Sequence, residues 1–131
     1  MMKRMLIVTV LVASVITLSN CNKKVSSYNH DFVGQWRTDV INDTLINEAI
    51  RSELIFDEKD GTYNNGCKDV CDDQLCDCVS QQSGRALVSF DKTLIKIGSS
   101  NSLTLSIDEL PHQVTGGAWE MKIGGLVYYK Q

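Results

Sequence analysis

The chain has very little proline and histidine, and it lacks the short motifs that mark many enzyme active sites. Its 131 residues include one proline and two histidines. It contains no Gly-x-Ser-x-Gly, no His-Glu-x-x-His and no phosphate-binding loop. His30 lies in a polar N-terminal segment and His112 follows Pro111 in an expected connection, so we interpret both as exposed polar residues. We therefore expect a protein that is not an enzyme, with no cofactor and no metal ion.

The N-terminus carries a short positive segment followed by an apolar one. Lys3 and Arg4 precede an apolar run over residues 5–17, which is too short to span a bilayer comfortably. The run leads into Leu18-Ser19-Asn20-Cys21. This order of charge, apolar run and Leu-Ser-Asn-Cys resembles the signal peptide of a bacterial lipoprotein. The resemblance implies that residues 1–20 are removed and that Cys21 is acylated.

The same resemblance implies a location in the cell envelope, facing an oxidising space. Bacterial lipoproteins typically carry several acyl chains on this cysteine, and stable anchoring takes more than one chain. Asn22 is not the aspartate that retains many such proteins at the inner membrane. We therefore expect a lipid-anchored protein of the outer membrane, and the alternative is an uncleaved signal anchor.

The chain has fewer basic than acidic residues. There are 13 Lys and Arg against 16 Asp and Glu, a net charge of −3. Removal of residues 1–20 takes away Lys3 and Arg4 but no acidic residue, which makes the net charge −5. Contacts with phosphate need lysine and arginine, so nucleic acid is not an expected partner. An anionic lipid surface would repel such a protein, and we therefore assign membrane attachment to the acyl chains on Cys21.

The mature chain is expected to form a tether followed by one domain rich in β-strands. Residues 21–31 lack an apolar period and are predicted to be the lipidated cysteine and a flexible tether. The folded domain is expected over residues 32–131, which suffice for one core. Alternating apolar and polar residues predict eight strands in hairpin order. They lie near 33–38, 53–57, 62–64, 85–90, 93–97, 103–108, 119–123 and 126–130.

This pattern favours a mainly β fold, an antiparallel meander barrel with one short helix after the first strand. Closure removes the exposed edges that invite pairing with other chains, and a β-sandwich is the alternative. The helix is predicted from an apolar stripe at helical spacing over residues 45–50, with Asn42 or Asp43 placed to cap its start. Short strands leave little lumen. We expect a filled core that includes Trp36, Phe56, Val88, Phe90, Leu105, Trp119 and Met121.

A second resemblance lies in the first predicted strands. Gly34-Gln35-Trp36 resembles the Gly-x-Trp signature that opens lipocalin-type barrels. Leu54-Ile55-Phe56, followed by Asp60-Gly61-Thr62-Tyr63, is similar to the second and third strands of small lipocalin-like domains in bacterial lipoproteins. The resemblance implies that Trp36 plugs the barrel floor beside Gly34 and that a basic residue, here Lys130, covers it. It also implies carriage of a small apolar ligand.

The most unusual composition lies in a predicted loop over residues 66–80. Four cysteines alternate with four aspartates, namely Cys67, Asp69, Cys71, Asp72, Asp73, Cys76, Asp77 and Cys78. An oxidising compartment favours two disulfides, since an even number of cysteines remains once Cys21 is acylated. Nested pairing joins Cys67 to Cys78 and Cys71 to Cys76. Crossed pairing joins Cys67 to Cys76 and Cys71 to Cys78, and both remain open.

A metal site is the alternative interpretation of these cysteines. Four thiolates hold zinc in many proteins, but the C-x3-C-x4-C-x-C spacing differs from the paired C-x2-C pattern of strong zinc motifs. The four aspartates do not match a calcium-binding loop. We therefore predict disulfides, with aspartates that are solvated at the loop tip.

Two functions from different classes follow from these features. In the first, the protein is a non-enzymatic binding module whose disulfide-braced acidic loop contacts a protein or cationic partner, for example a secreted hydrolase that it inhibits. The candidate contact residues are Asp69, Asp72, Asp73 and Asp77. A rigid loop favours this hypothesis because less entropy is lost on docking. In the second, the protein is a lipocalin-like carrier of a small apolar ligand.

Overall fold

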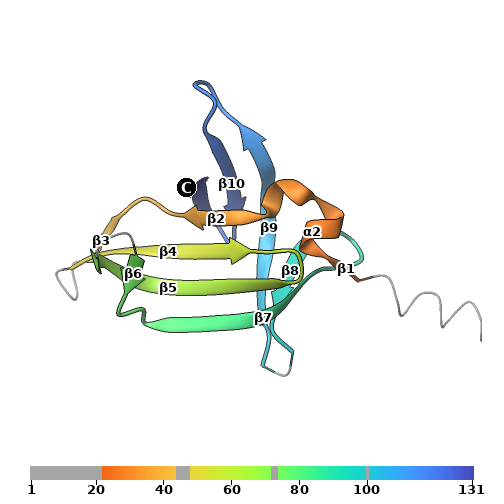
Figure 1. Cartoon of the computed structure of the whole chain (residues 1–131), viewed down its shortest axis with the longest axis horizontal. Coiled ribbons are helices and arrows are strands. Elements are labelled where there is room, and N and C mark those ends of the chain that lie inside the picture. Colours follow the sequence, from red (N-terminus) through yellow and green to blue (C-terminus); the bar gives the residue numbers. More distant parts are fainter. Residues whose placement is uncertain (1–21, 44–47, 72–73, 100) are drawn as a thin grey trace, which may run out of the picture.

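The chain folds into a closed antiparallel β-barrel (Figure 1). The computed structural model describes residues 22–43, 48–71, 74–99 and 101–131. In these ranges the barrel wall consists of β2 (Gly34–Arg37), β4 (Glu48–Phe56), β5 (Asp60–Cys71), β7 (Ser80–Val88), β8 (Leu94–Ile97), β9 (Leu103–Gln113), β10 (Trp119–Ile123) and β11 (Leu126–Lys130). Successive wall strands pair with each other, and β11 pairs with β2 to close the ring. The predicted meander barrel is confirmed, because a sandwich would leave the ring open.

Three short strands extend this wall. β1 (Lys23–Lys24) pairs with β7, β3 (Ile41–Asp43) pairs with β4, and β6 (Gln74–Cys76) pairs with β5. All of these pairings are antiparallel, so no crossover connection is needed between them.

The hairpin between β10 and β11 shows how directly the sequence determines this wall. Ile123 pairs with Leu126 across a two-residue turn made of Gly124 and Gly125. The φ angles of these glycines are +58° and +80°, a left-handed conformation that glycine adopts without strain. Met121 and Ile123 point into the core on the alternate positions of β10.

The barrel interior is filled by its own side chains. The largest fully buried side chains are Trp36, Tyr128, Phe32, Phe56, Leu54, Ile95, Ile97, Met121, Ile123, Val25, Val88 and Cys67. Burial raises the pKa of the Tyr128 phenol, as expected for a hydroxyl removed from water. Of the predicted core residues, Leu105 and Trp119 are only partly buried. Phe90 was expected inside and is 65% exposed, because it lies in the turn after β7 and not on its inward face.

The segment before the barrel differs from the flexible tether expected there. Helix α2 (Val25–Tyr28) and the 3-10 helix η1 (His30–Phe32) pack against the barrel end. Val25 and Phe32 are buried, and the Ser26 hydroxyl donates to the Glu58 carbonyl over 2.7 Å. Because both apolar side chains enter the core, the domain begins at β1 and not at Phe32.

The described residues contain one short α-helix, α2, but it precedes the strands of the barrel wall and does not follow the first of them. The stripe at residues 45–50, where the helix was expected, is not helical where the structure describes it. Ala49 and Ile50 belong to β4, where they pair with Asn42 and Ile41 of β3. Residues 44–47 lie outside the described residues. A spacing of four residues returns to the same face of a strand as well as of a helix, so this stripe is compatible with both structures.

Pro111 lies inside β9 and not in the expected connection. The β9–β10 ladder shifts register between the Glu120–His112 pair and the Lys122–Glu109 pair, which places an extra β9 residue opposite β10. A bulge is where a sheet tolerates proline, because the missing N–H falls at an interruption of the ladder. His112 is consequently a strand residue.

Candidate functional site

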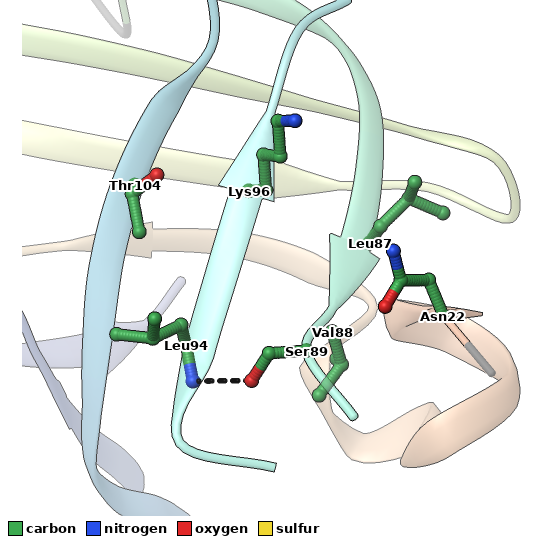
Figure 2. Close-up of a pocket in the computed structure, with 7 residues that line it drawn as sticks. All are labelled: Asn22, Leu87, Val88, Ser89, Leu94, Lys96 and Thr104. Carbon is green, nitrogen blue, oxygen red and sulfur yellow. Dashed lines mark hydrogen bonds between the residues drawn. The ribbon is translucent and has the colours of Figure 1, made fainter. Parts of the chain in front are cut away.

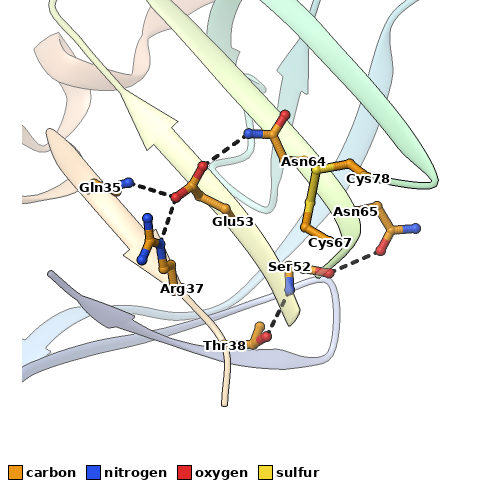
Figure 3. Close-up of a disulfide and its surroundings, with 9 residues drawn as sticks. All are labelled: Gln35, Arg37, Thr38, Ser52, Glu53, Asn64, Asn65, Cys67 and Cys78. Carbon is orange, nitrogen blue, oxygen red and sulfur yellow. Dashed lines mark hydrogen bonds and ion pairs between the residues drawn. A yellow bond between two sulfur atoms is a disulfide. The ribbon is translucent and has the colours of Figure 1, made fainter. Parts of the chain in front are cut away.

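The segment predicted as a cysteine loop is a hairpin that extends from the barrel wall. β5 and β7 pair as far as Asn65 and Ser80, and β5 then continues to pair with β6. A disulfide joins Cys67 to Cys78 at the base of this hairpin (Figure 3). This is the outer bridge of the nested pairing, so the crossed pairing is excluded, as is a zinc site that uses all four thiolates.

The remaining residues of this hairpin are placed only in part. The side chains of Cys71, Cys76 and Asp69 lie outside the described residues, as do Asp72 and Asp73 entirely. Asp77 is exposed and precedes Cys78 directly. The predicted inner bridge and the four-aspartate contact surface therefore stay predictions.

A buried polar network supports the base of the hairpin, and sequence reasoning missed it. Glu53 on β4 is 4% exposed. Its carboxylate accepts hydrogen bonds from Gln35 Nε2 at 2.7 Å, Arg37 Nε at 2.8 Å and Asn64 Nδ2 at 3.0 Å (Figure 3). Two bonds come from β2 and one from β5, so Glu53 ties three wall strands together next to Cys67. A buried carboxylate needs such partners to offset its lost hydration.

Ser52, the residue before Glu53 on β4, makes a second set of hydrogen bonds. Ser52 donates its hydroxyl to Asn65 Oδ1, and its backbone N–H donates to Thr38 Oγ1, each over 3.0 Å. Asn65 is the last β5 residue paired with β7 before the hairpin departs. The hairpin therefore leaves the barrel from a rigid, hydrogen-bonded base.

Gly34, Trp36 and Lys130, the predicted floor residues, lie together in the structure. Trp36 is fully buried, and its indole N–H donates to the Phe32 carbonyl over 2.8 Å. Lys130 Nζ lies 5.3 Å from the centroid of the Trp36 ring, a cation–π distance. Gly34 is needed for this approach, because a Cβ at that position would lie 2.8 Å from Lys130 Cε. Lys130 also lies 5.6 Å from the Trp119 ring centroid.

Two small pockets open elsewhere on the described part of the chain. One of about 250 Å³ has mainly polar side chains around it, from Tyr63, Ser80, Gln81, Gln82, Asn101, Ser102 and Leu103. Drug-sized ligands occupy about 300–1,000 Å³ in apolar surroundings. The pocket is therefore smaller than the sites that usually hold such ligands.

The second pocket, of about 150 Å³, lies where the described chain begins (Figure 2). Its lining comes from β7, the turn after it, β8, β9 and the first described residue, namely Asn22, Leu87, Val88, Ser89, Leu94, Lys96 and Thr104. Exposed apolar side chains lie close by, since Phe90 follows Ser89 and Leu94 is 39% exposed. Lys23 and Lys24 follow Asn22 on β1, so basic residues gather at this end of an acidic protein.

His30 is exposed, as expected from the sequence, whereas His112 is partly buried and lies on a strand and not in a connection. His30 lies in η1 and its Nε2 is 3.0 Å from Glu58 Oε1, with both side chains exposed. His112 Nε2 is 3.4 Å from Glu120 Oε1 on the neighbouring strand. Glu109 lies beside this pair. A proline inside an alternating strand pattern is the sequence signal that would have indicated this bulge and its cluster.

In the described part of the chain, no helix has both the length and the apolar character needed to cross a membrane. No family model, curated protein or solved structure matches the sequence or fold of this chain, so the site is interpreted from its own residues.

Proposed function

We propose that this protein is a lipid-anchored binding module of the bacterial cell envelope that acts through its surface and not through catalysis. It is held at the outer membrane by acyl chains on Cys21, and the disulfide-braced acidic hairpin over residues 66–80 contacts a protein or cationic partner. The observation that carries this proposal is the filled barrel. With Trp36, Phe56, Ile95 and Met121 fully buried inside, binding falls to the outer surface.

The positions of the N-terminal segment and of the cysteine hairpin support anchoring by one end of the molecule and partner binding by the other. β1 and α2 lie at one end of the long axis of the barrel, and β3 and β6 lie at the other (Figure 1). An anchor on Cys21, one residue before Asn22, would therefore hold the first end near the lipid and leave the hairpin free to face outward. The lysines near Asn22 suit contact with lipid headgroups, which the net charge alone would disfavour.

The hairpin suits partner binding because its base is rigid. The Cys67–Cys78 bridge closes a short segment, and the Glu53 network holds the strands from which it departs. A braced segment loses less conformational entropy on docking than a flexible one. Its aspartates would supply the charge complementarity that speeds encounter with a cationic partner.

A lipocalin-like carrier is the second candidate, and the floor formed by Gly34, Trp36 and Lys130 favours it. A carrier needs an open lumen. An apolar ligand would have to displace fully buried side chains such as Phe56 and Met121, which costs their packing. Native mass spectrometry distinguishes the two candidates, since a carrier retains bound ligand and a filled module does not.

The first prediction tests the anchor. Cys21→Ser is expected to abolish incorporation of radiolabelled palmitate and to move the protein from the detergent phase to the aqueous phase in a detergent partition. The reason is that acylation needs the Cys21 thiol. Cys71→Ser serves as the matched control, because it removes a cysteine outside the signal segment and should leave labelling unchanged. Equal labelling of the wild type and Cys21→Ser would contradict the proposal.

The second prediction tests the hairpin. Asp72→Asn together with Asp73→Asn is expected to weaken capture of an envelope partner, because it removes two negative charges from the braced segment. Asp31→Asn together with Asp39→Asn removes the same charge from exposed positions elsewhere and should leave capture unchanged. Capture is measured by pull-down from envelope extracts. Equal losses in both double variants would show a net-charge effect, and no loss in either would remove the hairpin from the proposal.

A further inference from the structure

A cluster of three potential metal ligands lies on the outward face of the β9–β10 hairpin, apart from the anchor and the cysteine hairpin. Glu109, His112 and Glu120 each offer one ligand atom, and these atoms all lie within 4.8 Å of one another. Glu109 is exposed, whereas His112 and Glu120 are partly buried. The cluster therefore sits at the surface, where a metal ion has access.

The bulge at Pro111 is what brings the three side chains together. Residues three apart on a regular strand point to opposite faces. Between the Glu120–His112 pair and the Lys122–Glu109 pair, β9 holds one more residue than β10. The extra residue shifts the alternation of side chains between the two faces of β9. Glu109 therefore lies on the same face as His112, and Glu120 points to this face as well. The same bulge that accommodates proline therefore builds the cluster.

The imidazole of His112 is oriented for ligation. Its Nδ1 lies 2.7 Å from the Leu110 carbonyl oxygen, which can only accept a hydrogen bond. Nδ1 therefore carries a proton and donates, and Nε2 faces Glu120 at 3.4 Å. A metal-binding histidine characteristically donates its second ring N–H to a carbonyl or carboxylate, which fixes the ring.

Two carboxylates share this small space. Glu109 and Glu120 would repel each other at neutral pH unless a positive charge lies between them. The 3.4 Å between His112 Nε2 and Glu120 Oε1 matches the separation of about 3.4 Å between neighbouring ligands of a tetrahedral zinc ion with bonds of about 2.0–2.1 Å.

We propose that Glu109, His112 and Glu120 bind a divalent first-row transition-metal ion, with zinc the ion that best suits one imidazole and two carboxylates. Three protein ligands leave at least one coordination position open. That position is available to water or to a side chain of a partner protein. The proposal is independent of lipid attachment and of the acidic hairpin.

The test is isothermal titration of Zn²⁺ into the mature protein, with its disulfides oxidised and any free thiols alkylated. We expect one ion per chain, with an affinity that falls at least about tenfold in His112→Ala and in Glu120→Gln. His30→Ala is the matched control, because His30 faces a single carboxylate, and it should bind as the wild type does. Circular dichroism shows whether each variant keeps its fold.

Two outcomes would overturn the proposal. If Zn²⁺ gives no binding heat, the three residues do not form a zinc site. If binding persists unchanged in both His112→Ala and Glu120→Gln, the ion occupies another site. X-ray absorption of the zinc-loaded protein adds an independent readout, in which a shell of nitrogen and oxygen supports the cluster and sulfur ligands contradict it.

Discussion

Substitution of Trp36 by alanine is expected to lower the free energy of unfolding by about 3–5 kcal/mol, which is the cost of a large cavity in a packed core. Trp36 is fully buried and closes the barrel floor between Phe32 and Lys130. Its removal also leaves the Phe32 carbonyl without its indole donor. Chemical denaturation of the protein measures the loss.

Trp119→Ala is the control for this measurement. Trp119 lies at a similar distance from Lys130 but is only partly buried, so its removal should cost clearly less. Equal losses in the two variants would mean that contact with Lys130, and not burial in the floor, determines the stability. A Trp36→Ala loss below about 1 kcal/mol would contradict a filled floor altogether.

The second large effect is expected at Glu53. Glu53→Ala should lower the free energy of unfolding by about 3 kcal/mol, because it removes a carboxylate that accepts three hydrogen bonds where water has little access. Glu53→Gln keeps one acceptor oxygen and should cost less. Thermal and chemical unfolding of both variants provide the comparison.

The exposed pair of Glu58 and His30 is the matched control for Glu53. Both side chains are more than two-thirds exposed, so Glu58→Ala should change stability by less than about 1 kcal/mol. The Ser26 bond survives this change because it uses the Glu58 backbone carbonyl. If the two alanine variants lose equal stability, burial is not what makes the Glu53 network important.

The barrel was predictable because its information is local. Strict alternation over Trp119–Ile123 and the Gly124-Gly125 turn predict a hairpin from adjacent residues alone, and the structure has it in that register. Closure follows from the count of strands and the cost of open edges. The prediction of a helix over residues 45–50 was wrong because the deciding information is not local. Only the pairing of Ala49 and Ile50 with β3 distinguishes a strand from a helix there.

The polar sites were not predictable from the sequence because they depend on register between strands. Glu53 meets Arg37 and Asn64 only once β2, β4 and β5 are aligned. Glu109 joins His112 only because of a bulge in β9. In the sequence, Pro111 was interpreted as part of a connection between strands and not as a bulge. The outer disulfide pairing likewise became clear only when β5 and β7 placed Cys67 and Cys78 at one base.

The pairing of β11 with β2 has a consequence for the order in which the chain folds. Lys130 pairs with Trp36, so the contact that closes the barrel joins residues at opposite ends of the domain. Contacts of such long sequence separation slow folding, since the loop-closure entropy is lost before the contact is gained. Synthesis proceeds from the N-terminus, and the floor residues lack their final partner until β11 is present. The barrel is therefore expected to close only after β11 has been made, however early the preceding hairpins form.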